Sequence, residues 1–324
     1  MGRRPREGGP APGREYSLWV LEGGTDRPVA GSMNWKIPEE VLKARQAFSF
    51  PGGEHRDVGV LCLHGFTGSP AELRPMGEYL ADRGLAVEGP LLPKHGGMPH
   101  ELKGATWRSW VGAAHDALNE LAGRCQRVFI AGLSMGGLIA LHLAASECYR
   151  AACNGQPSPL RGIVVMAAPS AVNDARTRLV RFARYFVPYY YPLKGANFDD
   201  PKFRADILQR MGANDAGLNL DDPRVRKQII EGVRIPVAAI HELLELNRLV
   251  MRELPRVTTA ALFIQGRKDR VIAPDSADVI AARVGTKDKR VIWYENSAHE
   301  LPLGPDAPAM FAEIGAFIQA HGLN

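Results

Sequence analysis

The chain has 324 residues, of which 45% are hydrophobic and 23% are charged, and its formal net charge at pH 7 is +5. This length accommodates one large α/β domain with an insertion and does not require two independent domains. The positive charge is too weak and too dispersed for a nucleic-acid-binding surface, so we expect no nucleic-acid partner.

The first 15 residues are rich in glycine, proline and arginine. Such a stretch cannot bury enough apolar surface to fold, so we predict a disordered tail over residues 1–15. It lacks the apolar region of a secretory signal peptide, and Arg6 stands where a myristoylation signal requires Ser or Thr. No apolar run approaches the length of a membrane-spanning helix. These observations predict a cytoplasmic protein without an integral membrane segment.

From residue 58 onward, segments with strand-like and helix-like patterns alternate. The predicted strands are short apolar runs over residues 58–63, 85–87, 127–131, 162–166, 260–264 and 290–294, with residues 48–50 as an earlier candidate. The predicted helices cover residues 71–83, 107–121, 135–145 and 308–321, and Gly84 and Gly123 are expected to end the first two. This alternation is typical of a mostly parallel sheet with helices on both faces.

Residues 171–256 interrupt the alternation, because they contain no convincing strand. Two helices are predicted there, over residues 175–186 and 236–253, with prolines and glycines between them. We predict that this segment is a helical cap inserted over the carboxyl edge of the sheet, and that residues 16–170 and 257–324 form the α/β core. No internal repeat is evident.

The pentapeptide GLSMG at 132–136 follows one predicted strand and begins one predicted helix. This is the setting of a nucleophile elbow, a tight and strained turn whose flanking positions must be small, as Ala131 and Gly137 are. The turn lifts the Ser134 hydroxyl above the sheet edge, at the positive end of the following helix. The pattern therefore predicts Ser134 as a nucleophile.

A serine hydroxyl is a weak nucleophile until a base removes its proton. His299 follows the last predicted strand, and Asp269 follows the strand before it, so the chain order is nucleophile, acid, histidine. The acid would fix the imidazole tautomer and stabilise the imidazolium. Asp275 is the alternative acid, but it follows Pro274 at a predicted helix start, where its charge would favour the first turn.

Two backbone N–H groups are needed to bind the oxyanion that forms during acyl transfer. Met135, directly after the nucleophile, is predicted to supply one. Phe66 is predicted to supply the other, from the HGFTG loop at 64–68, whose glycines let the backbone approach a substrate. His64 and His95 are interpreted as residues that brace their loops rather than as catalytic bases.

Phe182, Tyr185 and Phe186 are spaced as one face of a helix in the predicted cap, and an apolar face must be buried against something. We predict that they line an acyl pocket; packing inside the cap is the alternative. The four cysteines match no zinc pattern, and a disulfide between Cys148 and Cys153 is an alternative to free thiols. No metal or cofactor is expected.

Five motifs occur in register: HGFTG at 64–68, KHG at 94–96, GLSMGG at 132–137, KDRVIAPDSA at 268–277 and WYENSAH at 293–299. Together they resemble the bacterial carboxylesterase and monoacylglycerol lipase family of α/β-hydrolases, over about residues 56–320. The resemblance implies the α/β-hydrolase fold with a small helical lid, Ser134, Asp269 and His299 as the triad, and metal-free hydrolysis of short to medium acyl esters or monoglycerides. Glu300 departs from the pattern, which has an apolar residue after the histidine.

The sequence thus predicts a serine hydrolase that cleaves carboxylic esters of small molecules or lipids through an acyl-enzyme intermediate. One alternative is a serine hydrolase of another acyl bond, namely a thioester, an amide or a carbon–carbon bond, because the same groups serve all of these reactions. The other is a non-catalytic binding protein on the same fold. The acyl-chain length and the oligomeric state are left open.

Overall fold

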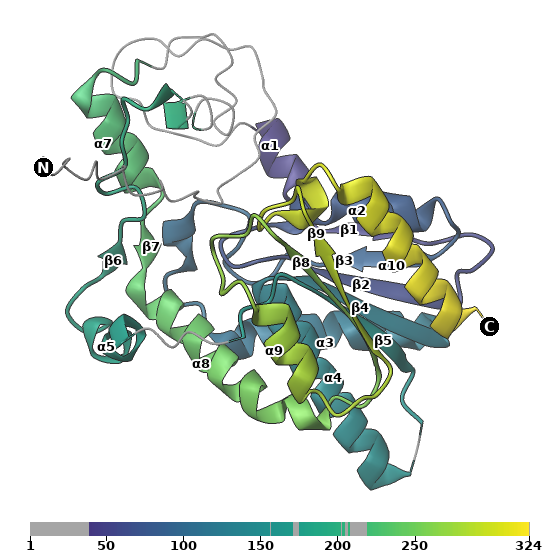
Figure 1. Ribbon diagram of the computed structural model, residues 1–324. Helices are drawn as coiled ribbons and strands as arrows, with labels where there is room; N and C mark the ends of the chain where they lie inside the picture. Colours follow the sequence, from purple (N-terminus) through teal and green to yellow (C-terminus); the bar gives the residue numbers. More distant parts are fainter. Residues whose placement is uncertain are drawn as a thin grey trace, which may run out of the picture.

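The structure is a computed structural model that describes residues 39–155, 157–170, 175–201, 203, 204, 207 and 219–323. The predicted disordered tail over 1–15 lies outside these residues. A seven-stranded sheet crosses the molecule and is covered by helices on both faces (Figure 1). Its strand order is β1-β3-β2-β4-β5-β8-β9, and all neighbours are parallel except the pair β1 and β3. The predicted mostly parallel sheet is confirmed.

The strands of this sheet lie where the apolar runs predicted them. They are β1 (Phe48–Phe50), β2 (Val58–Leu63), β3 (Ala86–Gly89), β4 (Arg127–Leu133), β5 (Leu160–Met166), β8 (Ala260–Gly266) and β9 (Lys289–Tyr294). All residues of β2 and β8 are buried, as expected for central strands that helices cover from both sides. The strand candidate at 48–50 is confirmed as the antiparallel edge strand β1.

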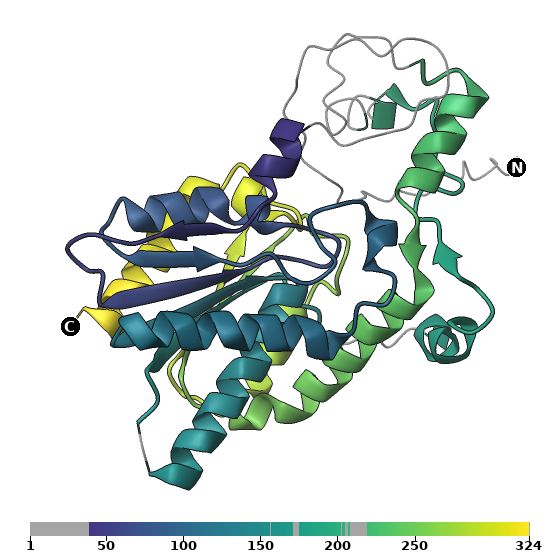
Figure 2. The same ribbon diagram turned by 180° about the vertical axis from the view of Figure 1, so that it is seen from behind.

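The helices pack in two groups, one on each face. The chain forms α1 (Glu39–Ala44), η1 (Pro70–Glu72), α2 (Arg74–Ala81), η2 (Pro99–Leu102), α3 (Trp107–Arg124), α4 (Met135–Asn154), α9 (Ser276–Arg283), η4 (Leu301–Leu303) and α10 (Ala307–Gly322). One apolar cluster joins α3, α4 and α9 to one face of the sheet, and another joins α2 and α10 to the opposite face. Figure 2 turns the view round and brings α3 to the front.

Several helix bounds differ from the prediction. The segment predicted as one helix over 71–83 forms η1 and α2, and α2 ends at Ala81. Gly123 does not end α3, which includes this glycine and ends at Arg124. The buried Leu121 one turn before the end holds the helix against the sheet, and this packing outweighs the low helix propensity of a single glycine. Likewise α4 continues to Asn154, where Gly155 in the left-handed conformation (φ 64°) ends it.

The segment 171–256 adds no strand to the seven-stranded sheet within the residues that the structure describes. It contains α5 (Ala175–Ala183), α7 (Pro223–Gly232) and α8 (Val237–Glu253), which η3 (Leu254–Arg256) follows. It also contains an antiparallel pair of two-residue strands, β6 (Tyr189–Tyr190) and β7 (Ile235–Pro236), which the sequence did not predict. Helix α5 ends at Ala183 and not at residue 186, and turns follow it. The helix stops before Pro188 because a proline disfavours the helical conformation at the residue that precedes it.

This segment also contains a short internal repeat, although none was predicted. The octapeptides NFDDPKFR at 197–204 and NLDDPRVR at 219–226 share the pattern Asn-x-Asp-Asp-Pro-x-x-Arg. In both copies the asparagine Oδ1 accepts a hydrogen bond from the backbone N–H two residues later, at 3.1 Å in the first and 3.0 Å in the second. The pattern is too short to stand out among 324 residues, but both copies begin with the same asparagine turn.

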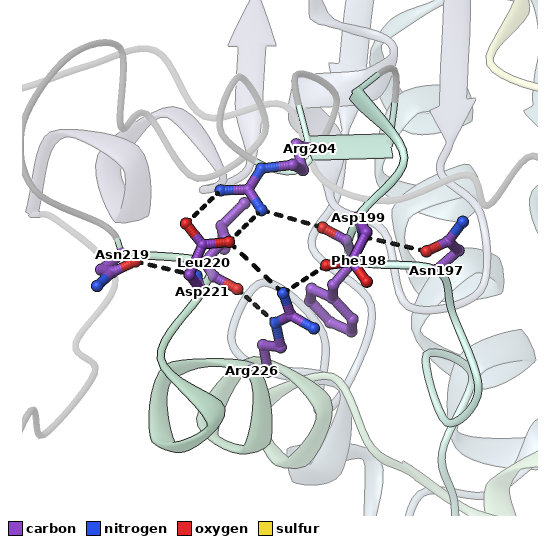
Figure 3. A network of polar contacts seen from close by, with 8 residues as sticks. All are labelled: Asn197, Phe198, Asp199, Arg204, Asn219, Leu220, Asp221 and Arg226. Carbon is purple, nitrogen blue, oxygen red and sulfur yellow. Dashed lines mark hydrogen bonds and ion pairs between the residues drawn. The ribbon is translucent and has the colours of Figure 1, made fainter.

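The two copies bind each other reciprocally, as Figure 3 shows. Arg204 of the first copy donates two hydrogen bonds to Asp221 of the second, at 2.7 and 3.3 Å. Arg226 of the second donates to Asp199 of the first, at 2.7 Å. We call these four residues the Arg–Asp clasp. The clasp lies next to a third apolar cluster, which contains the neighbours Phe198 and Leu220. The buried members of this cluster are Leu193, Phe198, Ile207, Leu220 and Ile229.

All four cysteines are free thiols. The disulfide between Cys148 and Cys153, which the sequence left as an alternative, is therefore not formed.

Candidate active site

Ser134 occupies a strained turn between β4 and α4. Its φ of 54° and ψ of −113° lie outside the conformations that a residue with a side chain ordinarily adopts. The turn has no room for larger neighbours: a Cβ added at Gly132 would lie 2.2 Å from the Gly136 carbonyl oxygen, and one added at Gly136 would lie 1.9 Å from the Leu63 carbonyl oxygen. This is the geometry that the GLSMG pattern predicted for a nucleophile elbow.

Asp269 and His299 form a hydrogen-bonded pair at the same edge of the sheet. Asp269 follows β8 and His299 follows β9, and the carboxyl ends of these parallel neighbours lie side by side. His299 Nδ1 and Asp269 Oδ2 are 2.8 Å apart, and both residues are buried. Asp269 Oδ1 accepts from the backbone N–H of Val271 at 2.8 Å. Asp275, the alternative acid, is exposed at the N-cap of α9. The structure thus places Asp269, and not Asp275, against the histidine.

The loops that carry this pair are held together by their backbones. The Arg267 N–H donates to the Tyr294 carbonyl at 2.9 Å, and the Lys268 N–H donates to the Ser297 carbonyl at 3.1 Å. A Cβ at Gly266 would lie 2.2 Å from the Ser297 carbonyl oxygen, so only glycine allows this approach. The distance between acid and base is therefore set by main-chain contacts.

The loop at 64–68 follows β2, next to β4, and passes close to the serine. A Cβ added at Gly65 would lie 3.7 Å from Ser134 Cβ. The two predicted oxyanion donors, Phe66 and Met135, belong to this loop and to the first residue of α4. The half-buried ring of Phe66 packs edge-on against Trp110, with 5.9 Å between ring centroids. The structure thus brings the loop of one donor next to the elbow that carries the other.

His64 and His95 brace this edge, as the sequence indicated. The Leu92 N–H donates to His64 Nε2 at 3.1 Å, so His64 Nδ1 carries the proton and donates to the Gly65 carbonyl at 3.0 Å. Burial, together with the neighbouring His95, holds the pKa of His64 well below its ordinary value. His95 Nδ1 lies 3.0 Å from the Pro93 carbonyl oxygen. Because both nitrogens of His64 are occupied, this side chain is not available as a base.

Glu72 is a residue of the site that the sequence did not single out. It lies in η1, and its Oε2 accepts from the Gly65 N–H at 2.9 Å. Burial raises the pKa of Glu72 to about 7, although the Gly65 hydrogen bond opposes the shift, and the charge of Glu300 raises it further. No sequence pattern marks this glutamate among 35 acidic residues. It holds the 64–68 loop through Gly65 and adds a titratable group that interacts with the charge of His299.

His299 is electrostatically biased toward its protonated form. Burial lowers its pKa, but the hydrogen bond that its Nδ1–H donates to Asp269 and the negative charges of Asp269, Glu300 and Glu72 outweigh burial and raise the pKa above its ordinary value. A histidine that must accept a proton from serine has to be neutral in the resting state. The carboxylates around His299 should therefore set the pH at which it becomes an effective base.

We expect Glu300→Gln to move the rising limb of the pH profile of kcat/KM to lower pH, by up to about one unit, because it removes a charge that favours the imidazolium. Glu72→Gln should act in the same direction and keep an acceptor for Gly65. Glu54→Gln is the control, since Glu54 is exposed at the amino end of β2, away from the site. The profiles are measured from pH 5 to 9 with a soluble ester. Superimposable profiles for wild type and Glu300→Gln would contradict the electrostatic account.

The three aromatic residues predicted to line an acyl pocket are largely exposed. Phe182, Tyr185 and Phe186 have exposed fractions of 64%, 69% and 85%. Only Phe182 lies in α5, because this helix ends at Ala183. The prediction that they form one buried helix face is therefore wrong. A role for them in binding the acyl chain remains a prediction from the sequence.

Within the described ranges, no group of three or more His, Cys, Asp or Glu side chains is placed to hold a metal ion. Over the same ranges, no helix combines the length and the apolar character that crossing a bilayer requires.

Comparison with known proteins gives a consistent result over most of the chain. The model of the family described as Hydrolase_4, serine aminopeptidase S33, matches residues 53–306. A thermostable monoacylglycerol lipase of Bacillus sp. (strain H-257) is 28% identical over 268 residues, which are 83% of this chain and 93% of that protein. A carboxylesterase of Bacillus subtilis (strain 168) is 26% identical over 276 residues, or 84% of this chain and 95% of that protein. A solved structure from work on LipS and LipT, two metagenome-derived lipolytic enzymes, superposes with a TM-score of 0.67 at 26% identity, covering 86% of this chain and 98% of that one.

Proposed function

Because the chain belongs to the Hydrolase_4 family, serine aminopeptidase S33, and has the α/β-hydrolase fold, we propose that it is a serine hydrolase that cleaves carboxylic esters. The observation that carries the proposal is the buried hydrogen bond between His299 and Asp269, at the same sheet edge as the strained turn of Ser134. A buried acid–base pair at the same sheet edge as a strained serine fits the arrangement that acyl transfer requires.

In this proposal the Ser134 hydroxyl attacks the ester carbonyl while His299 Nε2 takes its proton. Asp269 holds the proton on Nδ1 and stabilises the imidazolium. The backbone N–H groups of Phe66 and Met135 bind the oxyanion of the tetrahedral intermediate. His299 then gives its proton to the leaving alcohol, and the acyl group stays on Ser134. Water, activated by the same histidine, releases the carboxylic acid and restores the serine.

The substrate class is proposed from the relatives and from the sequence motifs together. Relatives that match more than four fifths of this chain are named as a monoacylglycerol lipase and a carboxylesterase, which favours short to medium acyl esters or monoacylglycerols. We also propose that the segment 171–256 is a cap over the carboxyl edge of the sheet, where ligands bind in open α/β sheets. A cytoplasmic location and the absence of a nucleic-acid partner remain predictions from the sequence.

The test is a panel of substrates that share one acyl group and differ in the bond. We expect the full chain to hydrolyse p-nitrophenyl butyrate with a kcat/KM at least about 10³-fold above that for the matched p-nitroanilide, and to release acid from monoacylglycerols. A fluorophosphonate probe should label Ser134, as mass spectrometry of the labelled peptide can establish. Faster turnover of the anilide would favour the amide alternative, in line with the description of the family as aminopeptidases.

The same panel tests the predicted acyl pocket. A side chain that lines the pocket contributes about 0.8 kcal/mol for each methylene that it buries, so its truncation shifts the preferred chain length. Phe186 is 85% exposed, and we expect Phe186→Ala to leave kcat/KM unchanged across soluble acetate, butyrate and octanoate esters. A selective loss with octanoate would restore the pocket role that the sequence suggested. A loss with every ester would instead indicate a structural role.

A further inference from the structure

Exposed apolar side chains are concentrated on one segment of the described chain. Among the described residues eight large hydrophobic side chains are exposed, and six of them lie within the twelve consecutive residues 179–190. These six, which we call the α5 patch, are Leu179, Phe182, Tyr185, Phe186, Val187 and Tyr190. Figure 1 shows α5 at the margin of the molecule, away from the sheet. Single exposed apolar residues are ordinary, but a cluster of this kind marks an interaction surface.

The stretch of sequence that carries the α5 patch has a net positive charge. The stretch 175–198 contains Arg176, Arg178, Arg181, Arg184 and Lys194, and it contains no Asp or Glu. The remaining 300 residues carry 35 cations and 35 anions, so the whole net charge of the chain, +5, equals the charge of this stretch.

Cations and aromatic rings are interleaved in this patch. The Arg181 guanidinium lies 5.9 Å from the Phe182 ring centroid, and the Arg184 guanidinium lies 4.7 Å from that of Tyr185. Aromatic rings favour the boundary between lipid headgroups and acyl chains, while guanidinium groups bind phosphate oxygens. The combination fits a surface of anionic phospholipid better than it fits water or an uncharged apolar groove.

The patch is fixed to the rest of the molecule. Arg184 hydrogen-bonds to Nδ1 of the buried His241 at 3.1 Å, which joins the end of α5 to α8. Helix α8 in turn contributes Ala239, Leu246 and Val250 to the main apolar cluster on the sheet. After α5, the chain pairs with β7 through Tyr189 and Tyr190. Docking through this patch would therefore hold the whole α/β core at the surface.

We propose that the α5 patch docks the protein on the surface of membranes that contain anionic phospholipids. The aromatic and aliphatic side chains enter the interface, and the exposed Arg181 and Lys194 bind the phosphate groups. Docking itself does not require catalysis. Docking would bring the enzyme to ester substrates that are held in the membrane. This consequence rests on the proposed function.

The experiment uses the full chain with Ser134→Ala, so that no lipid is hydrolysed, and measures co-sedimentation with vesicles. We expect at least tenfold stronger binding to vesicles of phosphatidylcholine and phosphatidylglycerol (3:1) than to phosphatidylcholine alone, and a marked loss of binding at high salt. Adding Phe182→Ser and Phe186→Ser should weaken binding at least tenfold, and adding Arg181→Glu should do the same. The control adds Val271→Ser and Leu303→Ser, which remove exposed apolar side chains outside the patch and should leave binding unchanged.

Three outcomes would overturn the proposal. The first is an absence of binding to the anionic vesicles at low salt, and the second is equal binding by the patch variants and the control. The third is a wild-type dimer that the patch variants dissociate while vesicle binding stays the same, because the patch would then join two copies of the chain. Phe182→Ser with Phe186→Ser in the active background should still hydrolyse soluble p-nitrophenyl acetate, which shows that the variant folds. Failure of all ester turnover would reject the proposed function without affecting the binding result.

Discussion

Ser134→Ala should lower kcat for ester hydrolysis by about 10⁶-fold, because in the proposed mechanism the hydroxyl oxygen attacks the substrate and the triad members act as a unit. For the same reason, Ser134→Ala with His299→Ala should be scarcely slower than the single variant. Activity is measured with p-nitrophenyl butyrate, and circular dichroism establishes that the fold is retained. A single variant that keeps a tenth of the wild-type rate would place the nucleophile at another residue.

The thermal stability of two variants at position 134 tests the backbone strain of the elbow. Alanine keeps the Cβ and therefore the strain of φ 54°, whereas glycine adopts this conformation without a steric penalty. Ser134→Gly should be as inactive as Ser134→Ala but should have a higher Tm. Equal Tm values for the two variants would mean that the turn relaxes when the hydroxyl is removed.

Asp269→Asn should lower kcat by about 10⁴-fold, through the tautomer of His299. In the present structure Asp269 Oδ1 accepts from the Val271 N–H at 2.8 Å, and Oδ2 faces His299 Nδ1. An asparagine would keep its carbonyl oxygen on the Val271 amide and turn its NH₂ group toward the imidazole. His299 Nδ1 would then have to accept a hydrogen bond, so its proton would move to Nε2, and the ring could no longer take the proton of Ser134.

Asp275→Asn is the matched control for this variant, because Asp275 is exposed and lies six residues further along the same loop. Its kcat should stay within a few-fold of the wild-type value. A large loss for Asp275→Asn and a small one for Asp269→Asn would overturn the assignment of the acid, whatever the geometry of the resting enzyme.

The central strands and the elbow were predictable because their sequence signals are local. A parallel strand covered on both faces needs an unbroken apolar run, and β2, β4, β5 and β8 each have one. The elbow needs small residues at fixed offsets from the serine. The acid and base then followed from the rule that the carboxyl ends of parallel strands share one edge of the sheet. None of these predictions required knowledge of distant contacts.

Other features depend on residues that are far apart in the sequence, and these were missed. Glu72 matters because the backbone of Gly65 donates to it and because burial changes its pKa, and neither property is visible in the sequence around it. The reciprocal pairing of Arg204 with Asp221 joins residues 17 apart. The apolar spacing of Phe182 and Phe186 predicted burial, but these side chains are 64% and 85% exposed in the described structure.

The Arg–Asp clasp has a consequence for local stability and hydrogen exchange. Asp199 and Asp221 are 75% and 71% exposed, so their ion pairs add little to stability and are screened by salt. The apolar cluster beneath them is much smaller than the two clusters that flank the sheet. The amide hydrogens of α7 should therefore exchange by sub-global opening, faster than those of β4 and β5, and faster still as the ionic strength rises. Such openings can occur while Asp269 and His299, whose loops are anchored on β8 and β9, keep their geometry.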